Sequence, residues 1–341
     1  MNKRVLNILK YIFFIGGGIF LVWWQFHQMT ESQEKKFIYA ITHAKYWVLI
    51  PVIAMSLASH LSRSIRWRIL IEPLGYKPSI FNTFSATMVG YLANSFLPRL
   101  GEIIKCTMLG KYEKIPPQKL IGTIVVERLF DIICYIIFII ITVLIQYKRV
   151  GAFASERFKD INHKGGIPLW GKFAIGIAVI TLVIYALRWM YSKYDSSRPV
   201  QKVKSFTMGI AEGLATVKKL KNRGWFIFHT IFIWTMYLMQ IYIGFIAITE
   251  VSHLNLAAAC GVLTLATLAM IVTPNGLGTF PAAVFLVLQL YKIDDVIGEA
   301  FGWLMWGTTT FIILVFGSLF LILMIYVNNK KIRETDKLNP I

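Results

Sequence analysis

Apolar runs of roughly twenty residues recur along the chain, and they limit its fold more than any other feature of the sequence. An α-helix rises about 1.5 Å per residue, so about 20 residues cross the roughly 30 Å of hydrocarbon in a bilayer. Because lipid offers no partner to backbone N–H and C=O groups, such runs must form helices. The composition, 56% hydrophobic and 16% charged, fits the same class. We therefore expect an all-α, polytopic helical membrane protein.

The apolar segments divide the chain into spans and shorter pieces. They lie at about 5–26, 46–60, 80–97, 120–146, 170–190, 225–248, 256–272, 282–291 and 298–327. The first is read as a retained anchor, because it ends in aromatic residues without a small-residue cleavage site. We predict one membrane domain over 1–329, with inverted halves of about 1–190 and 225–329 and a basic cytoplasmic linker, 191–224. A polar cytoplasmic tail, 330–341, follows.

Two polar, glycine-containing breaks interrupt these apolar segments, at 94–102 and 273–281. Irregular backbone at membrane depth is tolerated where it is buried in protein or lines a polar cavity. A matched pair of breaks is typical of a transporter-like site at a repeat interface. Candidate residues here are Asn94, Asn275, Gly276 and Gly278, although glycine is also common where helices simply pack closely. We expect each break to form the tip of a re-entrant helical hairpin, the two being oppositely oriented.

The distribution of basic residues predicts the orientation. The net charge is +19, and the segments expected on one side carry 24 Lys and Arg residues against ten on the other. The positive-inside rule places both termini in the cytoplasm. Because the basic residues flank apolar spans, they fit anionic lipid headgroups, and we do not expect nucleic-acid binding. The expected location is the cytoplasmic (inner) membrane of a bacterium.

Charged residues within the apolar segments carry the chemical argument. They are Arg99, Glu102, Glu127, Arg128 and Asp131, and each costs about 2.5–3.5 kcal/mol near the centre of a span. One interpretation is structural, with Arg99 paired to Glu127 or Asp131 and Glu102 paired to Arg128. The other is functional, because the planar guanidinium of arginine binds two phosphate oxygens at once. We favour a role in passage of a phosphate-bearing headgroup.

A basic and aromatic group, Arg63, Arg66 and Trp67, follows the second apolar segment. Such groups form interfacial belts at many membrane surfaces, and this interpretation is favoured over a specific headgroup site. The three cysteines and six histidines are dispersed and lie outside metal-ligand spacings. No Walker-type phosphate loop is present. We therefore expect no metal, no cofactor and no catalytic residue.

Four ordered motifs resemble those of the lysylphosphatidylglycerol synthase transmembrane region family. They are Arg63-x-x-Arg66-Trp67, Asn94-x-x-x-Pro98-Arg99-x-Gly101-Glu102, Glu127-Arg128-x-x-Asp131 and Pro274-Asn275-Gly276-Leu277-Gly278. This is the flippase-like part of multiple peptide resistance factors, so the resemblance implies movement of a lipid between leaflets. The soluble aminoacyltransferase domain of those factors is not expected here. Pro281 stands where many relatives carry a glutamate, and Pro98 and Arg99 are adjacent where many have an intervening residue.

The sequence thus predicts translocation of a phosphate-bearing lipid, such as an aminoacyl-phospholipid or a polyprenyl-phosphate lipid. The alternative is a membrane enzyme, or an accessory subunit, that acts on a lipid-linked substrate. Against the enzyme stands the lack of a nucleophile or histidine beside the acids. Expected partners are membrane lipids, a second copy of the chain, or a lipid-synthesising enzyme.

Overall fold

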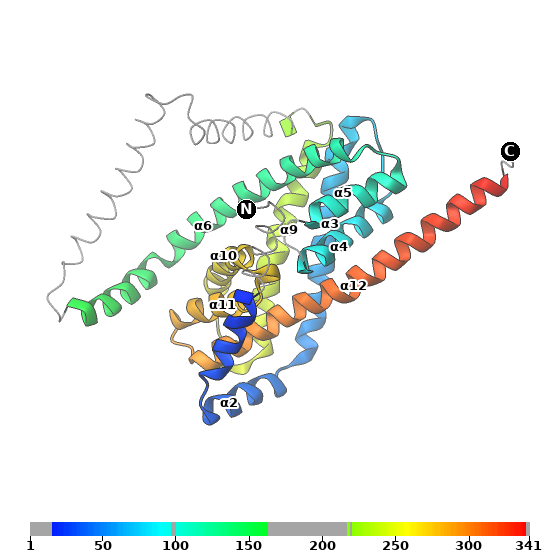
Figure 1. Ribbon diagram of the computed structural model, residues 1–341. Helices are drawn as coiled ribbons and strands as arrows, with labels where there is room; N and C mark the ends of the chain where they lie inside the picture. The colour runs from blue at the N-terminus through cyan, green and yellow to red at the C-terminus, as the bar shows by residue number, and fades with distance from the viewer. Residues whose placement is uncertain (1–15, 97–99, 163–216, 219, 339–341) are drawn as a thin grey trace, which may run out of the picture. The chain divides into compact units, whose positions relative to one another are not determined.

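The computed structural model describes residues 16–96, 100–162, 217–218 and 220–338, and every regular element in these ranges is helical. An unlabelled N-terminal helix covers residues 16–27. The labelled α-helices (Figure 1) are α2 (Glu31–Thr42), α3 (Leu49–Ile71), α4 (Ile80–Phe96), α5 (Leu100–Glu113), α6 (Pro117–Asn162), α9 (Arg223–Gly244), α10 (Leu256–Val272), α11 (Thr279–Gln289) and α12 (Asp295–Leu338). Short 3₁₀ turns are η1 (Tyr46–Val48), η2 (Glu72–Leu74), η3 (Phe245–Ala247), η4 (Thr249–Val251) and η5 (Pro274–Gly276). The expected span 170–190 and most of the linker 191–224 lie outside the described residues.

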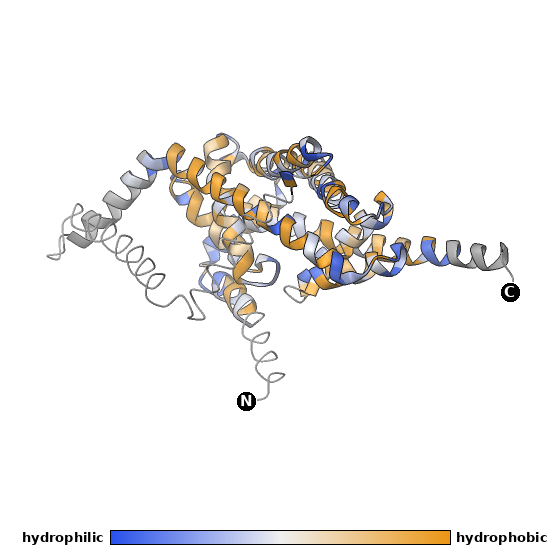
Figure 2. Ribbon diagram, turned by 90° about the horizontal axis from the view of Figure 1, so that it is seen from above, coloured by the Kyte–Doolittle hydropathy of each residue, from blue (hydrophilic) through white to orange (hydrophobic). Residues whose placement is uncertain are grey.

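Four of the described segments are long and apolar enough to cross a membrane. They are Tyr46–Leu74, Pro117–Tyr147, Arg223–Ala247 and Asp295–Lys330, and α10 and α11 are shorter apolar helices. In Figure 2 hydrophobic residues dominate α12 until hydrophilic residues take over toward its C-terminal end. The chain is therefore an all-α polytopic membrane protein, as predicted.

The chain separates into two compact units. One consists of Met1–Thr142 with Leu220–Ile341, and the other is Val143–Lys219. All contacts discussed below lie within the first unit. In the second, the described part is mainly the distal portion of α6, where Val143, Leu144 and Ile145 expose much of their side chains.

Two apolar clusters mark the two ends of α3. Val48, the residue before its first turn, belongs to the larger cluster together with Phe245, Ala247 and Leu288. Ile71, at its end, belongs to a smaller cluster whose other members include Trp67, Leu109, Ile115 and Met324. Between these ends α3 packs along α9, and α12 packs against both α4 and α11. Two of the segments that the basic-residue count places on one side, 63–77 and 105–119, therefore meet at one end of the unit.

The short helices form two hairpins. At the open end of the α4–α5 pair, Ser79 Oγ and Asn82 Nδ2 donate to Glu113 Oε1 over 2.8 and 2.7 Å. The open end of the α10–α11 pair lies in the other cluster, with Ala258 and Leu288. The two open ends thus lie at opposite ends of α3. Re-entry of these hairpins into the membrane stays a prediction.

Three element bounds differ from the predicted ones or refine them. Helix α3 continues to Ile71, whereas the apolar run suggested an end near His60. The prediction used hydropathy, which falls at Arg63, but the helix persists because protein surrounds this turn. Helix α6 begins at Pro117, as the double proline indicates, since proline suits the first turn. Helix α12 reaches Leu338, so most of the polar tail is helical.

Candidate functional site: a buried ionic network

Three residues of α3 point to the same buried region. Arg63, Arg66 and Trp67 are three and four residues apart, a spacing that puts them on one face of a helix. Arg66 and Trp67 are fully buried, and Arg63 is 6% exposed. The interpretation of these residues as an exposed interfacial belt is therefore wrong. Their polar groups face protein because α6 and α9 cover this part of α3.

Two carboxylates of α6 lie between the two arginines. Arg63 Nη1 is 3.2 Å from Glu127 Oε1 and 2.9 Å from Asp131 Oδ2. Arg66 Nη2 is 3.4 Å from Glu127 Oε1 and 2.7 Å from Asp131 Oδ1. Glu127 and Asp131 are one helical turn apart, so α6 presents both acids to α3 as the sequence predicts. Their partners are Arg63 and Arg66, which the sequence-based pairing with Arg99 did not include.

Lys105 of α5 completes the buried part of the network. Its Nζ is 3.2 Å from Glu127 Oε2 and 3.9 Å from the centre of the Trp67 ring. By sequence alone, Lys105 is one of the basic residues that flank apolar spans. Its place three residues after Glu102 was the available signal, since that spacing puts both on one face of α5. Trp67 therefore contributes a cation–π contact as well as its packing.

Arg128 and Glu102 form the accessible edge of the network. They pair as predicted, and Arg128 Nη1 is also 3.6 Å from Asp131 Oδ2. Their side chains are 43% and 31% exposed, whereas that of Glu127 is 1% exposed. This edge is where a ligand could reach the network without unfolding it.

Neutral donors and acceptors of α9 and α6 enclose the buried ions. Arg63 Nη2 donates to Tyr237 Oη over 3.3 Å, and Arg66 Nη1 donates to Thr230 Oγ1 over 3.2 Å. Trp67 Nε1 donates to Thr123 Oγ1 over 2.8 Å. Tyr237, Thr230 and Thr123 were not among the site residues predicted from the sequence. The seven-residue spacing of Thr230 and Tyr237 on one face of α9 was the one available signal.

The charges of the network do not cancel. In the described part of the chain it contains four cations, Arg63, Arg66, Lys105 and Arg128, and three carboxylates, Glu102, Glu127 and Asp131. Burying ions costs several kcal/mol each, and pairing repays this only with good geometry. A network that is buried and has an excess of cations therefore favours an anion at its accessible edge. Arg99 lies outside the described residues.

The remaining candidate residues lie apart from this network. Asn94 holds the tip of the first hairpin, because its Oδ1 accepts from Gly101 N over 2.8 Å. Asn275 has a positive φ of 52°, its Nδ2 donates to Thr310 Oγ1, and its carbonyl accepts from Trp306 Nε1 over 2.8 Å. The second break is thus fixed against α12.

The two glycines of the second break have structural reasons to be glycine. Gly276 and Gly278 have φ values of 71° and 73°, a region that favours residues without Cβ. The Gly278 carbonyl accepts from Gln25 Nε2 of the N-terminal helix over 3.0 Å. The turn η5 also contacts α4, so the second break packs beside the first hairpin. No group of three or more His, Cys, Asp or Glu that could hold a metal occurs in the described part of the chain.

The fold and the network define a polytopic membrane protein whose interior contains ion pairs with one more cation than carboxylates. The chain belongs to the lysylphosphatidylglycerol synthase TM region family, whose model matches residues 7–317. It is 23% identical over 283 residues to the UPF0104 membrane protein MJ1595 of Methanocaldococcus jannaschii, covering 76% of this chain and 79% of the relative. It is 27% identical over 214 residues to the UPF0104 membrane protein MJ1078 of the same organism, covering 59% and 80%. No solved structure matches the chain.

Proposed function

We propose that this chain is a flippase-like protein that translocates a phosphate-bearing lipid across the cytoplasmic membrane. The lipid is an aminoacyl-phospholipid or a polyprenyl-phosphate lipid. The observation that carries the proposal is the cation excess of the buried network together with the exposure of Arg128 at its edge. Ionisable groups within membrane-spanning segments mark transport pathways more often than they serve structure alone.

Arg128 is the residue that meets the headgroup first. A phosphate monoester or diester offers two oxygens to the planar guanidinium, and such charge-assisted pairs are stronger than neutral hydrogen bonds. In the structure Glu102 is paired with this guanidinium. The phosphate takes the place of Glu102, so the carboxylate acts as a removable partner. The electrostatic potential on the buried side of Arg128 is kept positive by Arg63, Arg66 and Lys105. The carboxylates of Glu127 and Asp131 hold these cations in position.

The two hairpins provide the route in this proposal. Each re-enters the membrane from the side of its open end, and the headgroup passes along the polar seam near their tips while the acyl chains stay in lipid. Both termini face the cytoplasm in this proposal, because the positive-inside rule puts the side richer in Lys and Arg there. The chemistry is transport without catalysis. A second copy or a lipid-synthesising enzyme is a candidate partner.

Transport by the purified chain in liposomes tests the proposal. The probes are headgroup-labelled phosphatidylglycerol, its lysyl form and undecaprenyl phosphate, each measured as transbilayer movement with time. Arg128→Gln should lose accelerated movement, because it removes the charge and the fork that hold phosphate. Arg128→Lys keeps the charge but loses the fork and should retain part of the rate. Lys77→Gln, which removes an exposed cation outside the network, should match the parent.

Two outcomes would overturn the proposal. Movement of a probe at the parental rate by folded Arg128→Gln would exclude the phosphate role of Arg128. Turnover of a lipid-linked substrate in detergent micelles, where leaflets do not exist, would instead favour an enzyme.

A further inference from the structure

The accessible edge of the ionic network limits which headgroups can bind there. Among the cations of the network in the described part of the chain, the side chain of Arg128 is 43% exposed. Those of Arg63, Arg66 and Lys105 are 7%, 0% and 7% exposed. Glu102, the partner of Arg128, is 31% exposed. A ligand can therefore reach the network at this pair without moving a buried side chain.

The two buried carboxylates are poor candidates for exchange with a ligand. Glu127 contacts three cations and is 1% exposed. Asp131 also contacts three cations and is 13% exposed. Withdrawing either acid would leave buried cations without a counter-charge, which is strongly destabilising. Among the described residues Glu102 forms its ion pair with Arg128 alone, so it is the carboxylate that a phosphate can replace.

Replacement of Glu102 by a ligand leaves the site with a net charge of +2. Four cations of the described chain belong to the network, and Glu127 and Asp131 are then the two carboxylates that balance them. A phosphate diester brings one negative charge. A phosphate monoester brings about 1.5–2 negative charges at pH 7, because the pKa of its second ionisation is about 6. The monoester therefore neutralises the site, whereas the diester leaves it positive.

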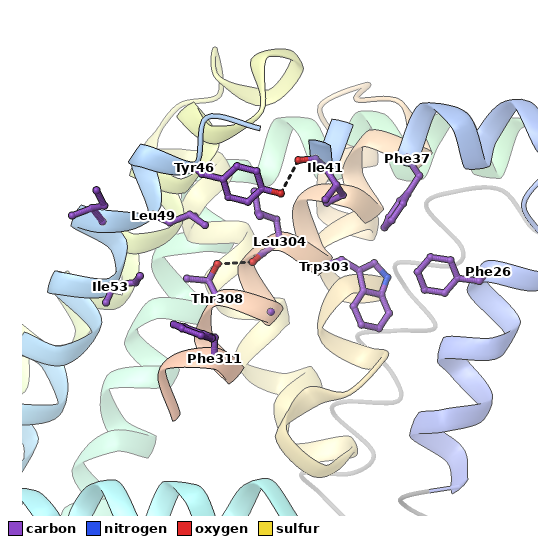
Figure 3. A pocket seen from close by; sticks show the side chains of 12 residues that line it. Phe26, Phe37, Ile41, Tyr46, Leu49, Ile53, Trp303, Leu304, Thr308 and Phe311 are labelled. Atoms are coloured by element: carbon purple, nitrogen blue, oxygen red, sulfur yellow. Dashed lines mark hydrogen bonds between the residues drawn. The ribbon is translucent and has the colours of Figure 1, made fainter. Parts of the chain in front are cut away.

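The apolar groove of the first unit offers a phosphate no counter-charge. Its volume is about 640 Å³, and it lies between the N-terminal helix, α2, the start of α3 and α12 (Figure 3). None of the described residues that line it is charged. The hydroxyls of Tyr46 and Thr308 donate to the carbonyls of Ile41 and Leu304 over 2.8 and 2.7 Å, so they are engaged within the protein. The charge of a headgroup is therefore better balanced at the edge of the network.

We propose that this edge selects lipids whose headgroup ends in a phosphate monoester, with Arg128 as the specificity-determining residue and Glu102 as the group that the phosphate displaces. The inference rests on the proposed function, since it uses the same site, and it narrows the substrate class. A polyprenyl phosphate carries a terminal monoester. An aminoacyl-phospholipid carries a diester, and its ammonium groups add positive charge. Of these two classes, the charge of the site favours the polyprenyl phosphate.

Lipid binding by the purified full chain in detergent tests the inference without a transport assay. Three dioleoyl lipids have the same chains and different headgroup charges, namely phosphatidic acid, phosphatidylmethanol and lysyl-phosphatidylglycerol. Native mass spectrometry at pH 8 counts which lipid stays bound from an equimolar mixture. Phosphatidic acid, the monoester, should be retained about tenfold or more over phosphatidylmethanol, because it brings a further negative charge close to Arg128. The lysyl lipid should be retained least.

Variants of the exposed pair separate ligand binding from packing. Arg128→Gln should lose the preference for the monoester, and Arg128→Lys, which keeps the charge, should keep part of it. Glu102→Gln should raise retention of phosphatidic acid about tenfold, because no carboxylate then competes for Arg128. A loss of packing would not produce this gain. Glu31→Gln removes an exposed carboxylate that pairs with Lys35 outside the network, so it is the matched control and should bind as the parent does.

The outcomes separate this inference from the proposed function. Equal retention of phosphatidic acid and phosphatidylmethanol, or a preference for the lysyl lipid, would overturn the inference and leave the Arg128→Gln transport test intact. Unchanged retention by Glu102→Gln would overturn the exchange on which the inference depends. Displacement of phosphatidic acid by an equal concentration of glycerol 3-phosphate would assign the site to a soluble phosphate monoester. Parental retention of all three lipids by Arg128→Gln would contradict the proposed function itself.

Discussion

At the scale of single residues, the network divides into a dry interior and an exposed edge. Glu127 is 1% exposed and contacts Arg63, Arg66 and Lys105, whereas Glu102 is 31% exposed and pairs with Arg128. Removing one member of a buried ion cluster leaves charges without compensation. Water can replace a lost partner at the edge, where screened pairs contribute little. The same chemical change should therefore have different consequences at the two acids.

Glu127→Gln should destabilise the protein by about 3–5 kcal/mol, because three cations lose a buried counter-charge. Glu102→Gln is the matched control, and it should lower the free energy of unfolding by about 1 kcal/mol or less. Unfolding by sodium dodecyl sulfate in mixed micelles, followed by circular dichroism, measures both. Equal losses in the two variants would show that the network is uniformly solvated and contradict the division.

At the scale of elements, the first hairpin depends on direct backbone contact between α4 and α5. A Cβ on Gly101 would overlap the Gly90 carbonyl and the Asn94 amide, and a Cβ on Gly90 would lie 3.0 Å from the Gly101 carbonyl. Asn94 also binds the Gly101 amide. Close approach at this point brings Glu102 and Lys105, which follow on α5, to the side of α6 that carries Glu127 and Arg128. The glycine pair thus positions part of the site.

Gly101→Ala should force α4 and α5 apart. It should lower the free energy of unfolding by about 1–3 kcal/mol or more, because the added methyl group overpacks a close contact. Gly122→Ala has open space around its Cβ and should be neutral or stabilising by up to about 1 kcal/mol, because alanine favours a helix. The melting temperatures of the two variants and the parent are measured by heating each protein and quantifying the folded fraction by size-exclusion chromatography. Equal melting temperatures for Gly101→Ala and the parent would mean that the hairpin tolerates separation.

At the scale of the whole molecule, the two hairpins have their open ends at opposite ends of α3. The open end of the α4–α5 pair lies at Glu113, beside Asn82 and Asn328, whose side-chain amides exchange hydrogen bonds of 3.1 and 2.8 Å. The open end of the α10–α11 pair lies in the cluster that contains Val48 and Ala247. A hairpin whose two ends meet on one side need not cross the membrane. This geometry is what makes the re-entrant topology testable.

Cysteine labelling in intact cells tests that topology. In a background with the three native cysteines replaced by alanine, Lys77→Cys and Gln118→Cys flank the α4–α5 hairpin at exposed positions. Both should resist an impermeant maleimide, whereas Lys45→Cys, exposed at the other end of α3, should react. Labelling of Gln118→Cys but not Lys77→Cys would show that the hairpin crosses the membrane and would reject re-entry.

The sequence by itself determined the class, the two breaks and the placement of Glu127 and Asp131 on one face of a helix. These follow from local rules, because the length of an apolar run decides whether it can span a bilayer, and helical spacing decides which residues share a face. The start of α6 at Pro117 was likewise readable, since proline lacks the N–H that a helix interior requires.

Only the tertiary structure decided which cations belong to the interior. Arg63 and Arg66 resemble interfacial residues because the apolar run stops before them, and Lys105 resembles a basic residue that flanks a span. Their carboxylate partners are far along the chain, with Glu127 64 residues after Arg63 and Asp131 65 residues after Arg66. Local hydropathy assigns a charge to water, but it does not contain the position of a counter-charge on another helix. Packing of α3, α5, α6 and α9 brings these groups together, and burial then favours the paired arrangement because an isolated ion there would be too costly.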